Sequence, residues 1–359
     1  MACGGNKRPP LMSEFDWIAW LKNAARQKLP ARPDVLLGIG DDAALCDVPD
    51  GMQLAISTDT LLAGVHFPAD TSPADIGYKA LAVNLSDMAA MGAEPCWFSL
   101  ALSVPDMDWD WLTAFTDGLL ELAAEHGLQL VVGDTTRGPL SITITVHGLL
   151  PKGQALLRSG AKAGDDIWLT GSIGDAAAAL RQWQGKQMQS MKLRHRLDRP
   201  TPRVSAGIAL RGLASAMLDV SDGLAQDLGH ILAASGVGAE LELGRLPVSH
   251  SLHDFYPDDT LRWQLQLAGG DDYELCFSAP PCHAFTIEQA MAACGVSASV
   301  IGHITSEPGL RCLTPDGEQL VLAQSGFQHF DGPANVHLRR AAETPLCLDC
   351  ARLRIRPVT

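Results

Sequence analysis

Five short segments constrain this 359-residue chain more than any other feature, because each of them places aspartate beside glycine, serine or threonine. They are GIGDD (38–42), STDT (57–60), NLSD (84–87), GDTTRG (133–138) and DVSDG (219–223). Several carboxylates that converge on one pocket repel one another strongly unless divalent cations neutralise them. Magnesium prefers one or two carboxylates together with phosphate oxygens of a substrate. The chain is therefore predicted to fold so that the ends of several elements meet around magnesium ions, and to carry out metal-assisted phosphoryl chemistry.

Each acidic segment also has a purely structural interpretation. Asp222 precedes a predicted helix and could be its N-cap, and Asp87 could be a polar residue at a subunit contact. Asp59 is harder to explain in this way, because the hydroxyl groups of Ser57, Thr58 and Thr60 surround it at the end of a predicted strand. Capping needs one residue per helix, so five such segments in one acidic chain favour the metal interpretation.

Charge excludes one large class of partner. With 27 basic and 41 acidic side chains the net charge is −14, which opposes association with the phosphate backbone of nucleic acid. A small anionic substrate would also be repelled unless bound cations reverse the local field, in agreement with the magnesium hypothesis. The start, MACGGNKRPP, has no apolar stretch after its basic residues, and no later stretch reaches the roughly 18 apolar residues of a membrane span. We therefore predict a cytoplasmic, soluble protein without a nucleic-acid or membrane partner.

Length and periodicity predict two domains of the α+β class. Single hydrophobic cores usually stop growing beyond about 250–300 residues. In the first half, helices are predicted at 14–27, 76–91 and 109–126, and strands at 35–39, 53–57, 97–104, 128–132 and 141–149. Helices on one side of a β-meander are typical of an α+β domain. The segments STDT and GDTTRG are predicted to form turns after their strands, and Asn84 and Asp87, three residues apart, to share one helix face.

A segment rich in glycine and lysine, 151–166, is predicted to separate the domains. The second half repeats the pattern, with strands at 167–170 and 216–220, a helix from Ala176, and a capped helix over SDGLAQDLGHILAASG that ends at Gly236. The polar segment 182–198 is predicted to be a mobile loop or a helical insertion, and DDYEL (271–275) a further acidic turn.

Two common nucleotide-binding motifs are excluded. Residues 38–43 formally fit the G-x-G-x-x-A dinucleotide fingerprint, but two aspartates at the closest approach would repel a pyrophosphate unless a cation intervened. The P-loop pattern G-x-x-x-x-G-K-[ST] does not occur in the sequence. Phosphate binding is therefore predicted to depend on metal ions, glycine turns and arginines.

The acidic motifs lie within longer segments: GIGDDAAL, LAISTDTLLAGVHF, DIGYKALAVNLSDMAAMGAEP, VGDTTRGPLSIT, RSGAKAGDDIW, LDVSDGLAQDLGHIL and GGDDYELCF. In residue sequence and in order these segments closely resemble motifs of the thiamine-monophosphate kinase family, within the aminoimidazole ribonucleotide synthetase-like superfamily. The resemblance extends from about Ser13 to Phe330. The resemblance implies transfer of the γ-phosphoryl group of ATP to thiamine monophosphate, which gives thiamine diphosphate. It also implies an α+β fold of two α/β domains of the aminoimidazole ribonucleotide synthetase-like type, and a homodimer built through the β-sheet of the N-terminal domain.

The resemblance divides the chain into three parts. Residues 1–152 are expected to form an N-terminal domain that binds ATP and magnesium and dimerises, and residues 153–331 a C-terminal α+β domain. Residues 332–359 lie beyond the resemblance and are predicted to be a flexible tail. The tail contains one Cys347-x-x-Cys350 pair, which is too small to make a four-ligand zinc site alone.

The resemblance also assigns site residues one by one. It implies that several magnesium ions share eight ligands: Asp42, Ser57, Thr58, Asp59, Asp87, Asp134, Asp219 and Asp222. It places Gly133, Asp134, Arg158 and Ser221 on ATP, and His66, Asp271 and Phe327 around thiamine monophosphate. At Asp271 the chain departs from the family pattern, which often has glutamate there.

The expected mechanism needs no general base, because the acceptor is a phosphate oxygen that is ionised or nearly so at neutral pH. Asp59 and Asp222 are expected to matter most, as ligands of the magnesium ions that assist direct in-line transfer without a phosphoenzyme. One alternative is another reaction of the superfamily, in which ATP activates an amide oxygen, a selenide or a carbamoyl group; Cys3 lacks the context expected of a selenophosphate synthetase. The other is a metal- and nucleotide-binding module without turnover, against which the complete set of ligands argues.

Overall fold

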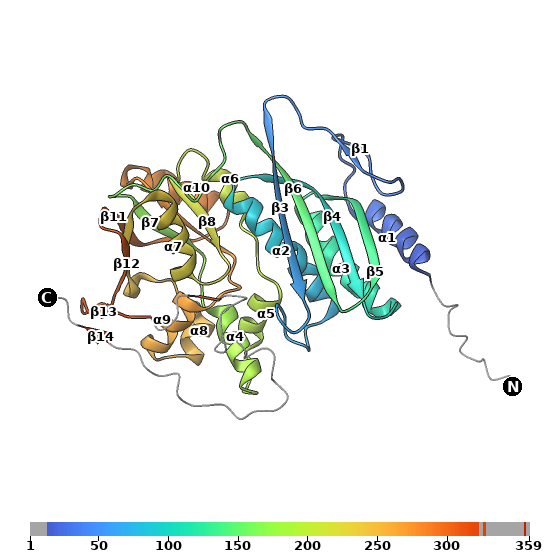
Figure 1. Ribbon diagram of the computed structural model, residues 1–359. Helices are drawn as coiled ribbons and strands as arrows, with labels where there is room; N and C mark the ends of the chain where they lie inside the picture. Colours follow the sequence, from blue (N-terminus) through green and yellow to red (C-terminus); the bar gives the residue numbers. More distant parts are fainter. Residues whose placement is uncertain (1–12, 323–325, 328–354, 357–359) are drawn as a thin grey trace.

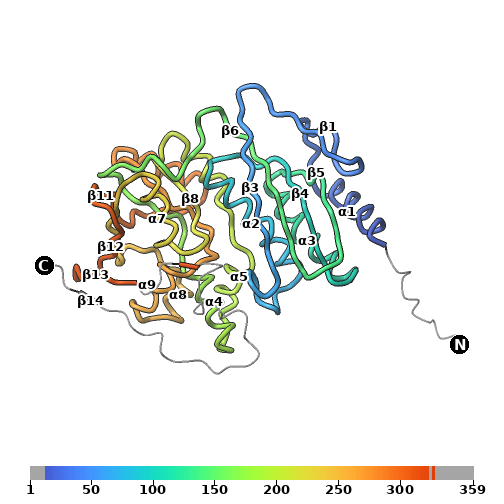
Figure 2. Tube along the Cα trace, viewed as in Figure 1, coloured from blue at the N-terminus to red at the C-terminus, as the bar shows by residue number. Residues whose placement is uncertain are grey.

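Two large β-sheets with helices packed on them, and a small two-stranded sheet, form the structure, a computed structural model that describes residues 13–322, 326–327 and 355–356. In Figure 1 the first sheet lies on the right and the second on the left. Figure 2 shows that consecutive halves of the chain form them, since the blue-to-cyan part of the trace stays with the first sheet and the yellow-to-red part with the second. Among the described helices, none combines the length and the hydrophobicity needed to cross a bilayer.

The first sheet has four strands in the order β3-β6-β4-β5. They are β3 (Met52–Leu62), β4 (Glu94–Val104), β5 (Gln129–Arg137) and β6 (Ser141–Pro151). The β4–β5 pair is parallel, so the predicted meander is wrong: a parallel pair needs a crossover connection, which here is helix α3 (Trp109–Glu125). Helix α1 (Glu14–Lys28) packs against α3 and β5, and a small hairpin of β1 (Val35–Leu37) and β2 (Leu45–Cys46) precedes β3.

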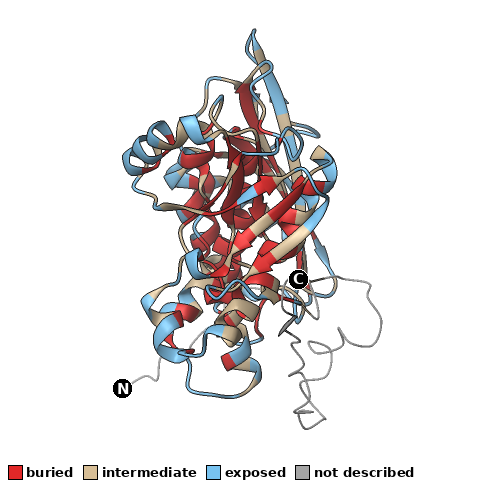
Figure 3. Ribbon diagram, turned by 90° about the vertical axis from the view of Figure 1, so that its left-hand side faces the viewer, coloured by how far each residue is buried: buried red, intermediate tan, exposed pale blue. Residues whose placement is uncertain are grey.

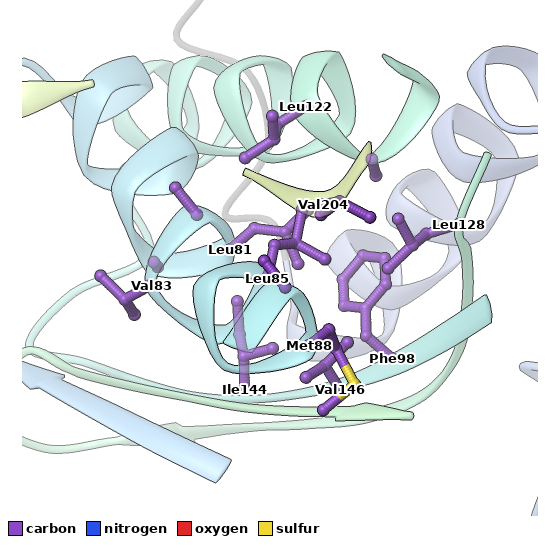
Figure 4. Packing of buried hydrophobic residues seen from close by; sticks show 14 of the residues in the cluster. Leu81, Val83, Leu85, Met88, Phe98, Leu122, Leu128, Ile144, Val146 and Val204 are labelled. Atoms are coloured by element: carbon purple, nitrogen blue, oxygen red, sulfur yellow. The ribbon is translucent and has the colours of Figure 1, made fainter. Parts of the chain in front are cut away.

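Helix α2 (Pro73–Ala90) occupies the centre of the molecule. It begins before the predicted residue 76, because Ser72 caps it by accepting a hydrogen bond from the Asp75 N–H and Pro73 is suited to the first turn. Figure 4 shows its side chains Leu81 and Leu85 between Leu122 of α3 and Ile144 of β6. Full burial of a leucine contributes about 1.5–3 kcal/mol. The helix is therefore held from several sides, and its polar residues have well-defined positions.

The second sheet has eight strands in the order β14-β13-β12-β9-β11-β7-β10-β8, all paired antiparallel except β9 and β12. They are β7 (Asp166–Thr170), β8 (Ala216–Val220), β9 (Gly238–Glu242), β10 (Glu274–Ala279), β11 (Ala298–Thr305), β12 (Gly309–Leu313), β13 (Gln319–Leu320) and β14 (Ile355–Arg356). The pairing of β14 with β13 is the described part of the predicted tail; Cys347 and Cys350 lie outside the described residues.

Seven helices and two short 3₁₀ turns are described in the second half of the chain. They are α4 (Asp175–Gln184), α5 (Met191–Asp198), α6 (Val204–Ala209), α7 (Leu224–Ser235), α8 (His250–Phe255), α9 (Asp259–Ala268), α10 (Ala284–Ala293), η1 (Leu243–Arg245) and η2 (Pro281–His283). Helix α7 ends at Gly236 in the left-handed conformation (φ 67°), as predicted. The polar segment 182–198 contains the end of α4 and all of α5, so the helical alternative is the correct one.

One hydrophobic cluster joins the two halves. It contains Leu81 and Leu85 of α2 together with Met217 of β8 and Phe277 of β10. Figure 3 shows the buried residues concentrated in the middle of the molecule, with exposed residues on the outer helices and loops. Residues of both halves that flank this shared core are therefore held at fixed positions relative to one another.

Candidate active site

Helix α2 presents polar groups to its neighbours at the junction of the two halves. Lys79 and Ser86 contact residues of the second half, and Asp87 contacts β3. Ser86 is seven positions after Lys79, which corresponds to about two helical turns, or roughly 10 Å along the helix axis. The helix thus supplies two groups of polar contacts, one near each end of this 10 Å interval.

The first group joins α2 to the middle of β3. The Ser57 hydroxyl donates a hydrogen bond to Asp87 Oδ2, and the Asp59 N–H donates to Asn84 Oδ1 at 3.2 Å. The carboxyl groups of Asp59 and Asp87 also share a hydrogen bond. Asn84 and Asp87 therefore face the same strand, as their spacing predicts.

A third carboxyl group reaches the same place from the second sheet. Asp219 on β8 accepts a hydrogen bond from Ser86 Oγ at 2.6 Å. The charge of Asp87 acts on both Asp59 and Asp219. We call Asp59, Asp87 and Asp219 the acidic cluster; it combines residues of both halves of the chain.

Burial and mutual repulsion raise the pKa values of the acidic cluster. Burial, and then the charge of Asp87, raises the pKa of Asp59 to about 7 and that of Asp219 to about 8. Burial raises the pKa of Asp87 as well, although hydrogen bonds from Ser57 and Asp59 and the charge of Arg158 oppose it. Three carboxylates in this place need either protons or a cation to relieve their repulsion.

The donor set of the acidic cluster fits magnesium. Carboxylate and hydroxyl oxygens are hard ligands, which Mg²⁺ prefers over nitrogen or sulfur. Within the described ranges, however, no group of three or more His, Cys, Asp or Glu side chains is close enough to hold a metal ion together. Water and substrate phosphate oxygens would have to complete the coordination, which is the usual arrangement for Mg²⁺.

The sheet separates three of the expected ligands from the acidic cluster. STDT and most of GDTTRG lie within β3 and β5, so the predicted turns are wrong. Side chains alternate along a strand, and Thr58 therefore points to the opposite face, where its hydroxyl pairs with Thr145 Oγ1 at 2.8 Å. Asp134, in register with Ala101, is on that outer face too. Asp42 belongs to the β1–β2 hairpin, which packs against the same face through residues such as Cys46.

Asp222 is not the cap of α7. The capping position is Gly223, whose φ of 126° favours glycine. Asp227, which the sequence analysis missed, accepts the N–H groups of Ser221, Asp222 and Gly223 at 3.0, 3.0 and 3.1 Å with one carboxylate oxygen. Burial raises the pKa of Asp227 to about 6, although these backbone hydrogen bonds oppose the rise. The sequence did contain a signal for this role: Asp227 is an acidic residue four positions after SDG, in the first turn of α7.

The Asp222 loop also holds Phe327. The Phe327 N–H donates to the Asp222 carbonyl oxygen at 3.0 Å, and Gln226 Nε2 donates to the Phe327 carbonyl oxygen at 3.0 Å. On the other side of the loop, the Asp271 N–H donates to the Ser221 carbonyl oxygen at 2.8 Å. Two of the residues expected around the substrate are thus attached to one loop.

The third residue expected there, His66, is connected to Asp271 through a lysine. Lys79 Nζ lies 3.1 Å from the His66 carbonyl oxygen and 3.2 Å from Asp271 Oδ1. The His66 ring is oriented by the Leu62 N–H, which donates to Nδ1 at 2.9 Å. The sequence analysis missed Lys79; the signal was a single lysine within a helix of alanine, leucine and isoleucine.

The two other residues expected on ATP have local roles in the structure. A Cβ atom at Gly133 would lie 2.6 Å from the Leu100 carbonyl oxygen, so strand packing requires glycine there. Arg158 is exposed, and its positive charge partly opposes the rise that burial causes in the pKa of Asp87. A cavity of about 540 Å³ lies elsewhere, beside α5, and is lined by residues such as Arg196, Arg203 and Glu274. None of the expected site residues lines it.

Comparison with known proteins gives consistent matches over most of the chain. Residues 40–150 match the family model of the AIR synthase related protein, N-terminal domain, and residues 162–313 that of the C-terminal domain. The thiamine-monophosphate kinase of Escherichia coli (strain K12) is 48% identical over 339 residues, which are 93% of this chain and 100% of that protein.

Two solved structures extend the comparison. The crystal structure of thiamine-monophosphate kinase from Stenotrophomonas maltophilia K279a is 47% identical, with a TM-score of 0.78 over 83% of this chain and 96% of that chain. A structure described as AaThiL complexed with AMPPCP and TMP is 27% identical, with a TM-score of 0.69 over 91% of this chain and 100% of that chain. These matches confirm the expected α+β fold of two AIR synthase-related domains.

Proposed function

The chain belongs to the thiamine-monophosphate kinase family of AIR synthase-related proteins, and on this premise we propose that it transfers the γ-phosphoryl group of ATP to thiamine monophosphate, giving thiamine diphosphate. The observation that carries the proposal is the acidic cluster, to which β3 and α2 of the first half and β8 of the second contribute. The relative that is described as complexed with AMPPCP, an ATP analogue, and TMP supports the choice of substrates. Because ATP is the donor, we also propose that the enzyme works in the cytoplasm.

We propose that Asp59, Asp87 and Asp219 hold Mg²⁺, with the Ser57 hydroxyl beside them. Bound there, the ion would neutralise the carboxylates and supply positive charge that stabilises the transferred phosphoryl group. Asp42, Thr58 and Asp134 are proposed as ligands of further ions on the outer face of the first sheet, and Asp222 as a ligand from the loop after β8. In this proposal residues 1–152 provide most of the magnesium and ATP site, and residues 153–331 complete it.

The remaining site residues are proposed to bind and orient the substrates. Gly133, Asp134, Arg158 and Ser221 are assigned to ATP, and Arg158 supports this role because it is an exposed cation near Asp87. His66, Asp271 and Phe327 are assigned to thiamine monophosphate, and the contacts of Lys79 and of the loop at 221–222 connect all three. These residues would hold the acceptor phosphate in line with the γ-phosphoryl group.

The proposed transfer is direct. The acceptor oxygen needs no base, so the protein's contribution is the positioning of two anions and the neutralisation of their charge. We therefore expect sequential kinetics in both substrates. Ping-pong kinetics or a covalent aspartyl phosphate would contradict direct transfer.

Product analysis tests the proposed function. The protein is incubated with ATP, Mg²⁺ and thiamine monophosphate, and the nucleotides and thiamine phosphates are separated by chromatography. We expect thiamine diphosphate and ADP in equal amounts, and no product with free thiamine or in excess EDTA. ADP without thiamine diphosphate would instead indicate another acceptor of the superfamily.

We further propose a homodimer in which a second copy covers the outer face of the first sheet. Within the described part of the chain, helices occupy the opposite face, and the β1–β2 hairpin covers one end of the outer face. Along β3 the side chains of Leu54 and Ile56 stay 40% and 59% exposed. Exposed apolar side chains such as these, next to hydroxyl pairs such as Thr60–Thr143, are typical of an interaction surface.

Ile56→Asp is expected to convert the dimer into a monomer, because it places a charge on this face without disturbing the core. Sedimentation velocity at several micromolar protein measures the mass directly. Phe285→Asp on α10, also at an exposed position, is the control and should leave the dimer intact. A monomeric unmodified protein, or a dimer that persists in Ile56→Asp, would refute this interface.

A further inference from the structure

Lys79 is a buried cation within an apolar helix. Its side chain is only 1% exposed, and its neighbours on α2 include Ile76, Ala80 and Val83. Lysine is almost never fully buried without partners, because removing its charge from water costs several kcal/mol. The two partners of this ammonium group among the described residues belong to the residues proposed to bind thiamine monophosphate: the His66 carbonyl oxygen and the Asp271 carboxylate.

Asp271 has an unusual backbone that gives its side chain a defined direction. The residue is in the left-handed region, with φ of 68°, and Tyr273 two positions later has φ of 53°. Residues other than glycine adopt this conformation only where the surrounding structure holds them. The Asp271 N–H donates to the Ser221 carbonyl oxygen, just after β8, and the Tyr273 N–H donates to the Val220 carbonyl oxygen at the end of β8, each at 2.8 Å.

A second set of contacts anchors the residue between them. Asp272 is buried, and its carboxylate accepts the N–H groups of Gly174 and Ala176 at the start of α4, at 2.7 and 3.4 Å. The backbone on both sides of Asp271 is therefore fixed, and only its side chain is left to be positioned.

The Asp271 carboxylate is held by one of its two oxygens. Lys79 Nζ lies 3.2 Å from Oδ1, and the Tyr273 hydroxyl donates to the same oxygen at 3.1 Å. Among the described residues, no hydrogen bond or ion pair occupies Oδ2. The Asp271 side chain is 28% exposed, so this second oxygen is accessible to a ligand.

Lys79 connects segments that are far apart in the sequence. His66 follows β3, Lys79 is on α2, and Asp271 lies between α9 and β10. A single ammonium group thus sets the separation between the His66 backbone in the first half and the Asp271 carboxylate in the second. Lys79 donates to both acceptors at once, which fits the three donors of an ammonium group.

We propose that Lys79 is a positioning residue for the thiamine ring system: it fixes the His66 loop and aims Asp271 Oδ2 at the cationic heterocycle of the substrate. The inference rests on the proposed function, because it assumes that His66 and Asp271 face thiamine monophosphate. Lys79 itself does not touch the substrate, since it is buried and both of its contacts are to protein. Its role is therefore in substrate recognition rather than in the chemical step.

The test compares Lys79→Met and Lys79→Arg with the unmodified enzyme in steady-state kinetics. Lys79→Met is expected to raise KM for thiamine monophosphate roughly ten- to hundredfold, because a charge-assisted hydrogen bond to each segment is lost. KM for ATP should change less than twofold and kcat only a few-fold. Lys79→Arg keeps the charge and should restore part of the affinity. Calorimetric titration of thiamine monophosphate, without ATP, gives the same comparison independently of turnover.

A double-mutant cycle shows whether Lys79 acts through Asp271. Asp271→Asn alone should also raise KM for thiamine monophosphate, and combining it with Lys79→Met should add much less than the product of the two single effects. The proposal would be overturned if the effects of the two substitutions on KM for thiamine monophosphate simply multiplied. It would also be overturned if KM for thiamine monophosphate and KM for ATP rose by the same factor. If Lys79→Met does not fold, as judged by circular dichroism, Lys79→Arg and Asp271→Asn must still show the selective change in KM.

Failure of this inference and failure of the proposed function give different results. If the unmodified protein makes no thiamine diphosphate, the proposed function fails, and the inference fails with it. If the unmodified protein is active and Lys79→Met keeps the same KM for thiamine monophosphate, only the inference fails. Lys28→Met, at an exposed ion pair with Asp117, is the matched control and should leave both KM values unchanged.

Discussion

Asp59→Asn is expected to lower kcat/KM for thiamine diphosphate formation by about a thousandfold and to raise the melting temperature of the protein. The loss of activity follows because a neutral amide replaces a carboxylate proposed to hold magnesium, and removal of one strong electrostatic contact to a reacting phosphate costs about 10²–10³ in rate. The gain in stability follows because Asp59 is one of three buried carboxyl groups that repel one another. Functional sites commonly have this conflict between activity and stability.

The two effects of Asp59→Asn are measured separately. Product formation is followed with saturating Mg²⁺, and the melting temperature by calorimetry in EDTA, so that no divalent ion compensates the repulsion. Asp117→Asn is the control, because Asp117 is an exposed residue of α3 whose side chain pairs with Lys28. Undiminished activity in Asp59→Asn would refute the metal role, whereas a loss of activity together with a lower melting temperature would indicate a structural role instead.

Glu274→Gln is expected to destabilise the protein by about 3–5 kcal/mol, the usual cost of removing one partner from a buried ion pair. Glu274 begins β10 and is 0% exposed. Its carboxylate accepts hydrogen bonds from Thr170 at 2.7 Å, from Arg196 at 2.8 Å, and from two nitrogens of Arg203 at 2.7 and 2.6 Å. When glutamine replaces Glu274, the partly buried guanidinium groups of Arg196 and Arg203 lose the negative charge that they share.

Equilibrium unfolding in urea, followed by circular dichroism, measures this change. Glu242→Gln is the matched control: Glu242 pairs with Arg245 on the surface, and exposed pairs contribute about 0–1 kcal/mol. The larger effect should therefore appear only at Glu274. A loss below about 1 kcal/mol at Glu274 would show that the arginines find other partners or water after the substitution.

Local signals in the sequence predicted nearly all elements of the first half and several of the second half correctly. The helices α1, α2, α3 and α7 appear within about three residues of their expected bounds, because apolar spacing and a glycine such as Gly236 after a helix are short-range features. STDT and GDTTRG were misassigned as turns because serine, threonine, aspartate and glycine favour turns locally. Pairing of β3 with β6 and of β5 with β4 overrides that preference.

Local sequence signals were also insufficient to predict all residues of the site. Resemblance selected residues by their place in a motif, and it selected Asp271 and His66 but not Lys79. No local pattern indicates that an ammonium group on α2 lies between a loop 13 residues earlier and a carboxylate of the second half. Asp227 was missed for a similar reason, since its three N–H partners are recognisable only once the loop before α7 is folded.

The sequence by itself determined the family, the order of the elements and the residue types that a magnesium-assisted phosphoryl transfer needs, because all of these depend on residues close together in the chain. Only the tertiary structure decided how those residues are divided in space. The two-residue period of β3 directs Ser57 and Asp59 toward α2 and Thr58 to the opposite face. The packing of α2 between both halves brings Asp219 to Ser86 and Asp271 to Lys79, and such long-range contacts arise from the burial of α2 in the shared core rather than from any short stretch of sequence.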